Sequence, residues 1–313
     1  MEEQHLTWAN VSLAFSFIVF DALISVSFGL GVSSALLTAA IRCVVQLSLV
    51  ALLLQKVFDS GNLWAVIGIS CLLNILGTFE TVVIKANRRH RYMFATTLTA
   101  MLVANVPVSI IGTRYAMAVD PFWEPAQFIP IIGMLCGNAV SGIVVSVDYL
   151  LKELGDTQDK VEMYLGFGAT RMEACRPLAR DALKLALTPA VNRMSVLGII
   201  AIPGMMTGAI LGGASVERAA RLQMIIIFMI TAATALAALV STVFALGIVV
   251  DGEHRVRTDR IDTREHVVWR ARDKAAGWVV EQVSEAARWM AHAICCARHS
   301  KDGDIEERTA LLE

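Results

Sequence analysis

The sequence is poor in charge: Asp, Glu, Lys and Arg make up only 18% of its 313 residues. Soluble domains carry about a quarter charged residues, whereas this chain is 56% hydrophobic and has a mean hydropathy of +0.60. The charged residues are too few to form a polar surface around so many apolar residues. This balance argues against a single soluble globule and favours an all-α, polytopic membrane protein. A net charge of −1 gives no reason to expect nucleic-acid binding.

Several motifs of enzymes and metal sites are also missing. None of the six cysteines has C-x-x-C spacing, and no H-E-x-x-H, histidine cluster or carboxylate dyad supports an intramembrane hydrolase. A G-x-x-x-x-G-K-[ST] phosphate-binding loop is absent as well. We therefore expect no catalytic residue and no cofactor bound by this chain. If ATP drives transport, the ATPase is another polypeptide.

Seven apolar runs have the roughly 20 residues that a spanning helix needs. They cover Thr7–Gly29, Ser34–Leu54, Leu63–Ile84, Phe94–Ala118, Phe128–Leu151, Ala182–Ile202 and Leu222–Val250. Basic residues concentrate in the connections 85–91 and 152–181 and at the start of the tail. By the positive-inside rule, the N-terminus lies outside and the C-terminus in the cytosol.

The composition changes after Val250. Residues 1–250 are predicted to form a transmembrane domain, and residues 251–313 a charged cytosolic tail. Apolar residues recur at helical spacing between Val268 and Ala293, which indicates an amphipathic helix on the membrane or on the protein. A solvated helix with scattered apolar residues is the alternative.

Polar residues inside the runs need a partner or a function, because a charge at the bilayer centre costs about 2.5–3.5 kcal/mol. Asp21 and Arg42 form a candidate intramembrane charge pair, and Gln46 shares a helix face with Arg42. Asn105, Asn138 and Asn192 either line a polar pathway or fix helix packing through hydrogen bonds. Gln46, Asn138 and Asn192 are candidate residues of the substrate pathway.

The segment PGMMTG is predicted to break the sixth run near its outer end. Such a break indicates a re-entrant helix that lines a substrate pathway, and a plain external turn is the alternative. The candidate gate residues here are Met194, Pro203, Gly204, Met205, Met206, Thr207 and Gly208. The methionines either bind soft ions or fill gaps in packing.

The connection 152–181 is predicted to form two short helices around a glycine turn. Thr170 and Glu173 have the spacing of a capping box. A hairpin of this kind is suited to dock in a groove of a partner.

Four motifs then stand in order: IPIIGMLCGN (129–138), VEMYLGFGAT (161–170), LTPAVNRMSVLG (187–198) and PGMMTGAILGG (203–213). With them the chain resembles the Fet-type ABC transporter permease family, which includes a bacterial iron-exporter permease and plant aluminium-tolerance proteins. Two features differ from the family pattern. Arg193 stands where the family usually has a small polar residue, and the tail 251–313 has no counterpart in the short bacterial members.

The resemblance implies that the hairpin is the coupling loop of an ABC permease, which seats on an ATPase subunit that holds the ATP and Mg. The residues concerned are Glu162, Gly166, Gly168, Ala169, Thr170, Arg171, Glu173 and Ala174. It also implies a homodimer and the export of iron or another metal ion, or of a nucleotide sugar. The alternative is a self-contained secondary carrier or channel that uses Asp21 or Glu80. The expected location is the plasma membrane or an endomembrane, and a dileucine pattern (307–312) and Cys295-Cys296 are candidate sorting and lipidation signals.

Overall fold

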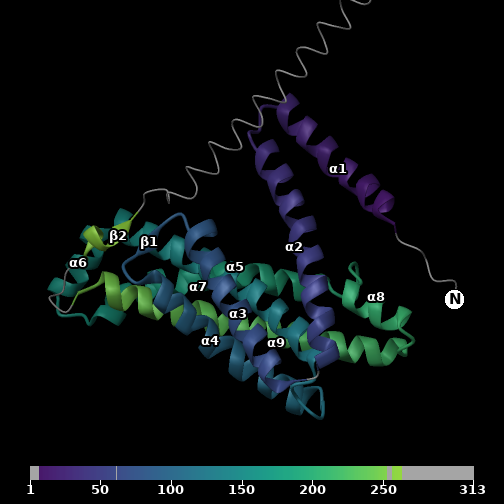
Figure 1. Cartoon of the computed structure of the whole chain (residues 1–313). Helices are drawn as coiled ribbons and strands as arrows, with labels where there is room; N and C mark the ends of the chain where they lie inside the picture. Colours follow the sequence, from purple (N-terminus) through teal and green to yellow (C-terminus); the bar gives the residue numbers. More distant parts are fainter. Residues whose placement is uncertain (1–6, 61, 252–255, 263–313) are drawn as a thin grey trace, which may run out of the picture. The chain divides into compact units, whose positions relative to one another are not determined.

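The computed structural model describes residues 7–60, 62–251 and 256–262, and most of them are helical (Figure 1). The chain divides into two units, which are described separately. Unit 1 contains α1 and α2 as far as Leu53, and unit 2 begins at Leu54. The predicted amphipathic helix, the dileucine pattern and Cys295-Cys296 lie outside the described residues.

The helices and strands follow one another with short connections. They are α1 (Trp8–Ser27), α2 (Ser33–Ser60), α3 (Leu63–Phe79), the π-helix η1 (Glu80–Lys85), β1 (Arg89–His90), α4 (Met93–Ile111), the π-helix η2 (Gly112–Ala116), α5 (Pro125–Asp156), α6 (Gln158–Gly166), α7 (Arg171–Val196), α8 (Gly204–Leu211), α9 (Val216–Val249), the 3-10 helix η3 (Thr258–Arg260) and β2 (Ile261–Asp262).

Among the described residues, six helices are long and apolar enough to cross a membrane: α1, α2, α3 with η1, α4 with η2, α5 and α9. The predicted helical membrane protein is therefore confirmed. The boundaries predicted for the sixth span, Ala182–Ile202, are wrong. The second helix of the hairpin and this span are one continuous helix, α7, which ends at Val196. Charged residues along its first half concealed this continuity. The count of seven spans and the orientation of the termini stay predictions.

α5 and α9 form the centre of unit 2. At 1.5 Å per residue they are about 48 and 51 Å long, well beyond the roughly 30 Å hydrocarbon core of a bilayer. Gly142 of α5 lies so close to α9 that a Cβ there would stand 2.6 Å from Cγ2 of Thr234. α3, α4 and α7 pack against this pair, so α5 and α9 are the frame on which the other elements are placed.

A buried polar network joins α3, α4 and α5. The Asn105 amide Nδ2 donates to Asn74 Oδ1 (3.0 Å) and to Cys136 Sγ (3.3 Å). All three side chains are buried. Interhelical hydrogen bonds of this kind contribute about 0.6–2 kcal/mol each, and the packing role predicted for Asn105 is confirmed.

Unit 2 has two different ends (Figure 1). The hairpin end comprises α6, the two-stranded antiparallel sheet of β1 and β2, η3 and the last turn of α9. The distal end comprises η2, α8 and the first turns of α5 and α9. Local sequence explains where two of these helices begin, because Thr170 and Ser215 cap the first turns of α7 and α9.

Candidate functional site: the α6–α7 hairpin and the α5–α7 pathway residues

The turn between α6 and α7 is built by Gly168 and Thr170. Gly168 has a φ of +89°, a conformation that favours glycine. Thr170 Oγ1 accepts from the Glu173 N–H, and Glu173 Oε2 accepts from the Thr170 N–H (2.9 Å), so the predicted capping box is confirmed. The hydrogen bonds from the Thr170 side chain and backbone lower the pKa of Glu173. The carboxylate therefore stays charged where it stabilises the start of α7.

The tip of the hairpin is apolar and faces outward. Phe167 is 83% exposed, and Met163, Tyr164 and Met172 are exposed around it. Val161, Leu165 and Ala174 are buried on the opposite side, so the hairpin is packed on its inner face only. Tyr164 is exposed, unlike its neighbours Val161 and Leu165. Exposed apolar clusters of this kind mark interaction sites.

Two predicted coupling residues point inward, toward the end of α9. Glu162 Oε1 accepts from the Gln158 side chain (2.9 Å) and from the Val256 N–H (3.3 Å). The Arg171 guanidinium donates to the Val250 carbonyl (3.3 Å). Gly166 ends α6, and Ala169 packs against the core. Glu162 and Arg171 therefore link the hairpin to the end of α9 and the residues that follow it.

Sequence reasoning missed the segment that Glu162 and Arg171 hold. We call residues 250–262 the strap; its residues 252–255 lie outside the described part of the chain. Val250 and Val256 are buried and join the core that contains Val161 and Leu165. The domain boundary after Val250 stays a prediction, although the described residues beyond it pack on unit 2.

Sequence reasoning also missed the role of Asp148 near the end of α5. Its carboxylate accepts from the Asn87 backbone N–H, the Asn87 side chain and the Arg88 N–H, each at 3.2 Å. This carboxylate anchors the connection between η1 and β1. An aspartate near the end of an otherwise apolar helix was the available signal.

Next to this anchor, His90 of β1 is buried. Its Nε2 lies 3.0 Å from Thr96 Oγ1, and its Nδ1 is buried without a hydrogen-bond partner among the described residues. Burial lowers the pKa of His90 to about 4. The imidazole is therefore neutral at physiological pH.

The structure brings together some of the predicted pathway residues. The Arg193 guanidinium donates to Asn138 Oδ1 at 2.7 Å, near the middle of α5. The Thr231 hydroxyl of α9 lies 3.6 Å from Met194 Sδ. Asn192 is exposed on α7. A guanidinium thus lies at mid-helix with an amide as its hydrogen-bond partner, and no carboxylate of the described residues pairs with it.

The predicted break of the sixth run exists, but it lies before PGMMTG: α7 ends at Val196, and Gly204 begins a separate short helix, α8. Pro203 precedes its first residue, Gly204, and the Thr207 hydroxyl donates back to the Pro203 carbonyl (3.3 Å). Met206 and Gly208 also lie on α8. Whether α8 re-enters a membrane stays a prediction.

α8 lines a cavity of about 940 Å³ at the distal end. Met205 and Ala209 come from α8, and the other walls come from residues 116–131 and 214–225. Several charged side chains there have close partners: Arg114 pairs with Asp120 (2.9 Å) and Arg221 with Glu217 (2.8 Å). We call this the distal cavity.

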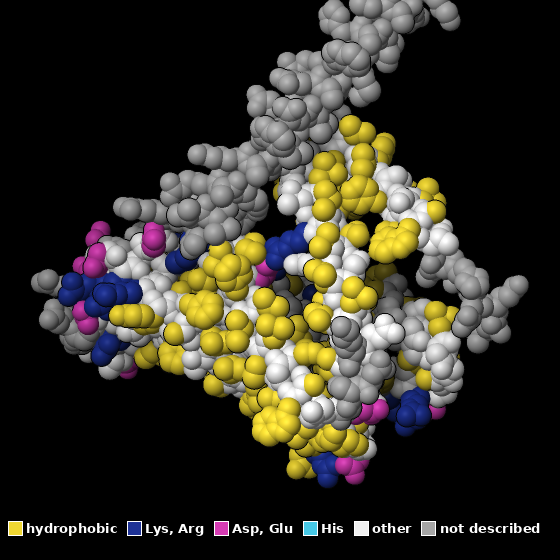
Figure 2. Space-filling view, viewed as in Figure 1, with side chains coloured by type: hydrophobic (Ala, Val, Ile, Leu, Met, Phe, Trp, Pro, Cys, Tyr) yellow, Lys and Arg dark blue, Asp and Glu magenta, His cyan; other side chains and the backbone are white. Residues whose placement is uncertain are grey.

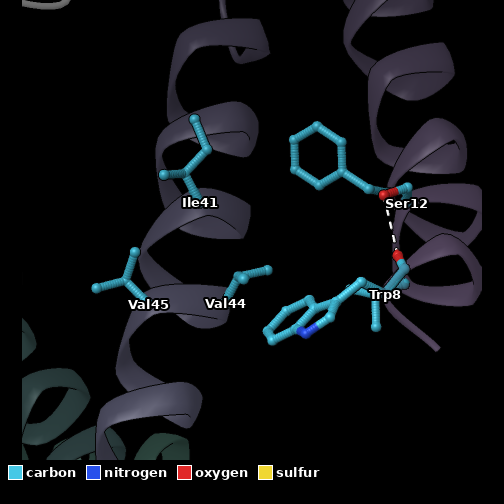
Figure 3. Close-up of a pocket in the computed structure, with 7 residues that line it drawn as sticks. Trp8, Ser12, Ile41, Val44 and Val45 are labelled. Carbon is cyan, nitrogen blue, oxygen red and sulfur yellow. Dashed lines mark hydrogen bonds between the residues drawn. The ribbon is translucent and has the colours of Figure 1, made fainter. Parts of the chain in front are cut away.

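In unit 1 the charge pair of Asp21 and Arg42 stays a prediction. Asp21 is exposed on α1, and Arg42 is half-buried on α2. Gln46 is exposed on α2. A pocket of about 280 Å³ between the two helices is lined mainly by apolar side chains, and the Ser12 hydroxyl at its wall donates to the Trp8 carbonyl (3.0 Å; Figure 3).

The surface of unit 2 divides by chemistry. Lys, Arg, Asp and Glu side chains gather at the hairpin end, at the left of Figure 2, and in smaller groups at the bottom and lower right of the view. The surface between these groups is mostly hydrophobic. Within the described ranges, no group of three or more His, Cys, Asp or Glu side chains is placed to hold a metal ion.

The model of the Uncharacterised protein family (UPF0014) matches residues 8–248. The chain is 29% identical over 214 residues to UPF0014 membrane protein STAR2 of Oryza sativa subsp. japonica, covering 68% of this chain and 73% of that one. It is 26% identical over 243 residues to the Probable iron export permease protein FetB of Escherichia coli (strain K12), covering 77% and 91%. It is 27% identical over 226 residues to Protein ALUMINUM SENSITIVE 3 of Arabidopsis thaliana, covering 72% and 81%.

No solved structure matches the chain. The family match spans more than half of the sequence, and the resemblance drawn from the four motifs is confirmed by these relatives. Together with the six apolar helices, these matches make the chain a multi-pass integral membrane protein. The chain therefore belongs to the UPF0014 family.

Proposed function

We propose that this chain is the membrane-spanning permease subunit of an ABC transporter, and that a separate subunit hydrolyses the ATP. The observation that carries the proposal is the α6–α7 hairpin. Its inner face is packed on unit 2, while Phe167 and its apolar neighbours project outward. A protruding hairpin with an apolar tip fits a groove on a partner.

The partner is an ATPase because this chain has no phosphate-binding loop of its own. In this proposal the hairpin end faces the cytosol, and closure of two ATPase subunits moves two hairpins. A homodimer supplies the second hairpin and the second half of the pathway.

For the cargo, we propose iron or another metal ion, exported from the cytosol. The name of the Escherichia coli relative, Probable iron export permease protein FetB, supports this choice. Because the described residues hold no three-ligand metal group, the cargo ion would bind transiently, through fewer side chains or through ligands shared between two copies of the chain.

One observation favours a second cargo class, an anionic solute such as a nucleotide sugar. Arg193 is held by Asn138 near the middle of α5 without a carboxylate partner among the described residues. A charge at that depth is costly in lipid, and an anion passing beside it would offset that cost.

Co-purification tests the ABC assignment. The tagged full-length chain is extracted in mild detergent, and bound proteins are identified by mass spectrometry. We expect a stoichiometric ATP-binding subunit with the wild-type chain, a loss of about tenfold or more with Phe167→Asp, because a charge cannot be buried in an apolar groove, and full retention with Lys152→Ala. Lys152 is exposed on α5, outside the hairpin.

A folded wild-type chain without any ATPase would overturn the proposal. The chain would then be an autonomous carrier, and Asp21 and Glu80 would be the ionisable groups to substitute next.

Transport into proteoliposomes separates the two cargo classes. Ferrous iron and a radiolabelled nucleotide sugar are the probes, with Arg193→Gln as the variant. If the cargo is a metal ion, iron moves with ATP and Arg193→Gln leaves it unchanged. If the cargo is anionic, the sugar moves instead, and Arg193→Gln slows it about tenfold or more.

A further inference from the structure

The strap contacts α6, α7 and β1 at the hairpin end. It continues α9, and it is held by α6 through Glu162 Oε1, which accepts from the Val256 N–H at 3.3 Å. It is held by α7 through the Arg171 guanidinium, which donates to the Val250 carbonyl at 3.3 Å. Both halves of the hairpin therefore have a direct hydrogen bond to the strap.

The other end of the strap is a strand of the small sheet. Ile261 and Asp262 pair antiparallel with His90 and Arg89 of β1. The Arg91 N–H donates to the Arg260 carbonyl (3.3 Å). The strap thereby reaches the connection between α3 and α4, which is far from the hairpin in the sequence.

β1 is in turn fixed to two membrane helices. The Arg89 guanidinium donates to the Val82 carbonyl at 2.6 Å and to the Val83 carbonyl at 3.3 Å, both in the π-helix that continues α3. Asp148 of α5 holds the residues just before β1. A displacement of β1 is therefore passed to α3 and α5.

The strap is braced within itself. The Arg260 guanidinium donates to the Ile248 carbonyl (2.7 Å) and lies 3.3 Å from the Asp251 carboxylate. The Arg257 N–H donates to the Val249 carbonyl (2.8 Å), and Val250 forms an antiparallel bridge with Val256. The strap bends back on the end of α9, and the hairpin cannot shift away from it without breaking hydrogen bonds and exposing the buried Val256.

We infer that the strap is a second transmission element, which passes movement of the α6–α7 hairpin to the α3–α4 connection, with Glu162, Arg171 and Arg260 as positioning residues. This inference rests on the proposed function for the origin of the movement. The coupling itself follows from a continuous, packed chain of contacts.

Hydrogen exchange on the full-length chain in lipid nanodiscs tests the coupling without any ATPase. Glu162→Ala removes the acceptor on the hairpin side. We expect amide exchange to rise about fivefold, as for one lost hydrogen bond, both in the hairpin (158–176) and in the remote connection (86–92). Arg260→Ala should have the same two effects from the strap side.

The controls separate coupling from general loosening. Glu162→Gln keeps the Oε1 acceptor and should restore both segments to nearly wild-type exchange, whereas Lys152→Ala should change neither. Faster exchange in the hairpin with an unchanged 86–92 segment would overturn the inference. If Arg260→Ala does not fold, Arg260→Lys and the comparison of Glu162→Ala with Glu162→Gln still test whether the strap couples the two segments.

The complex with its ATPase provides the second arm. A non-hydrolysable ATP analogue should alter exchange in both segments of the wild-type complex, and Glu162→Ala should confine the change to the hairpin. Equal transmission in Glu162→Ala would refute the role of the strap. If no ATPase binds the wild-type chain, the proposed function fails, while the first arm still decides whether the strap couples the two segments.

Discussion

The two ends of unit 2 are held together in different ways. At the hairpin end, hydrogen bonds join elements far apart in the sequence: Asp148 to Asn87 and Arg88, Glu162 to Val256, and β1 to β2. At the distal end, two ion pairs link neighbours in sequence, Arg114 with Asp120 and Arg221 with Glu217, near a cavity of about 940 Å³. At the hairpin end, hydrogen bonds therefore connect different helices and strands, whereas the distal end contains a cavity. This difference fits the proposed function, in which the hairpin end receives the movement and the distal end changes conformation.

Among the substitutions that test this difference between the two ends, Asp148→Ala is expected to lower the free energy of unfolding the most. Asp148→Ala removes three hydrogen bonds and leaves the backbone donors of Asn87 and Arg88 without their acceptor. A hydrogen bond contributes about 0.5–1.5 kcal/mol, and more when its acceptor is charged, so the loss of three should lower the free energy of unfolding by about 3 kcal/mol. Reversible denaturation in mixed micelles measures it, and a loss below about 0.5 kcal/mol would show that the hairpin end is not braced there.

The second effect is a pH dependence from His90. Its pKa in the folded chain is about 4, against 6.5 for an ordinary histidine. The unfolded chain therefore takes up a proton that the folded chain resists, and stability falls as the pH drops below 6.5, levelling off below about 4. Between pH 7 and pH 5 we expect a loss of about 2 kcal/mol.

The matched variant is His90→Gln, which does not titrate. Its stability should vary less between pH 7 and pH 5 than that of the wild-type chain, by the same amount. Parallel pH profiles for the two chains would mean that His90 is open to water and that the sheet of β1 and β2 is looser than described.

Between the two ends, Asn105→Ala breaks the network with Asn74 and Cys136. We expect a loss of about 1–2 kcal/mol in the free energy of unfolding, smaller than for Asp148 because fewer donors lose their partners. Thr99→Ala is a suitable control, since Thr99 is exposed on the same helix and bonds only within it. Equal effects of the two substitutions would argue against an interhelical role.

The smallest effect is expected at the distal end. Arg114→Ala removes a pair with Asp120 in which both side chains are largely exposed. Exposed pairs contribute about 0–1 kcal/mol, so the free energy of unfolding should change by less than about 0.5 kcal/mol. A loss as large as that of Asp148→Ala would erase the contrast between the ends.

Much of the fold was predictable because apolar length decides membrane-spanning helices. Six of the seven predicted runs correspond to such helices, and the capping box at Thr170 and Glu173 follows from local spacing alone. α7 was divided wrongly because its charged first half resembles a loop. Propensity and hydropathy describe neighbours in sequence, whereas α7 is helical along α5 and α9 through tertiary packing.

For the candidate site, the sequence predicted where the hairpin turns. It did not predict which of the hairpin side chains face the strap and which face outward. The glycine and the cap locate the hairpin, but Glu162 and Arg171 face the strap, and Phe167 is on the outside. Asp148 and the strap were missed because their partners lie 60 or more residues away in the sequence. Such pairings depend on the three-dimensional path of the chain.

The exposed tip of the hairpin has a consequence for biogenesis. If the proposed ATPase covers this tip, a newly made copy that has not yet bound the ATPase exposes Phe167, Met163 and Met172. Chaperones and proteases recognise apolar surface of this kind. Supply of the partner would then set the lifetime of this subunit, so that an excess of unassembled copies is removed rather than stored.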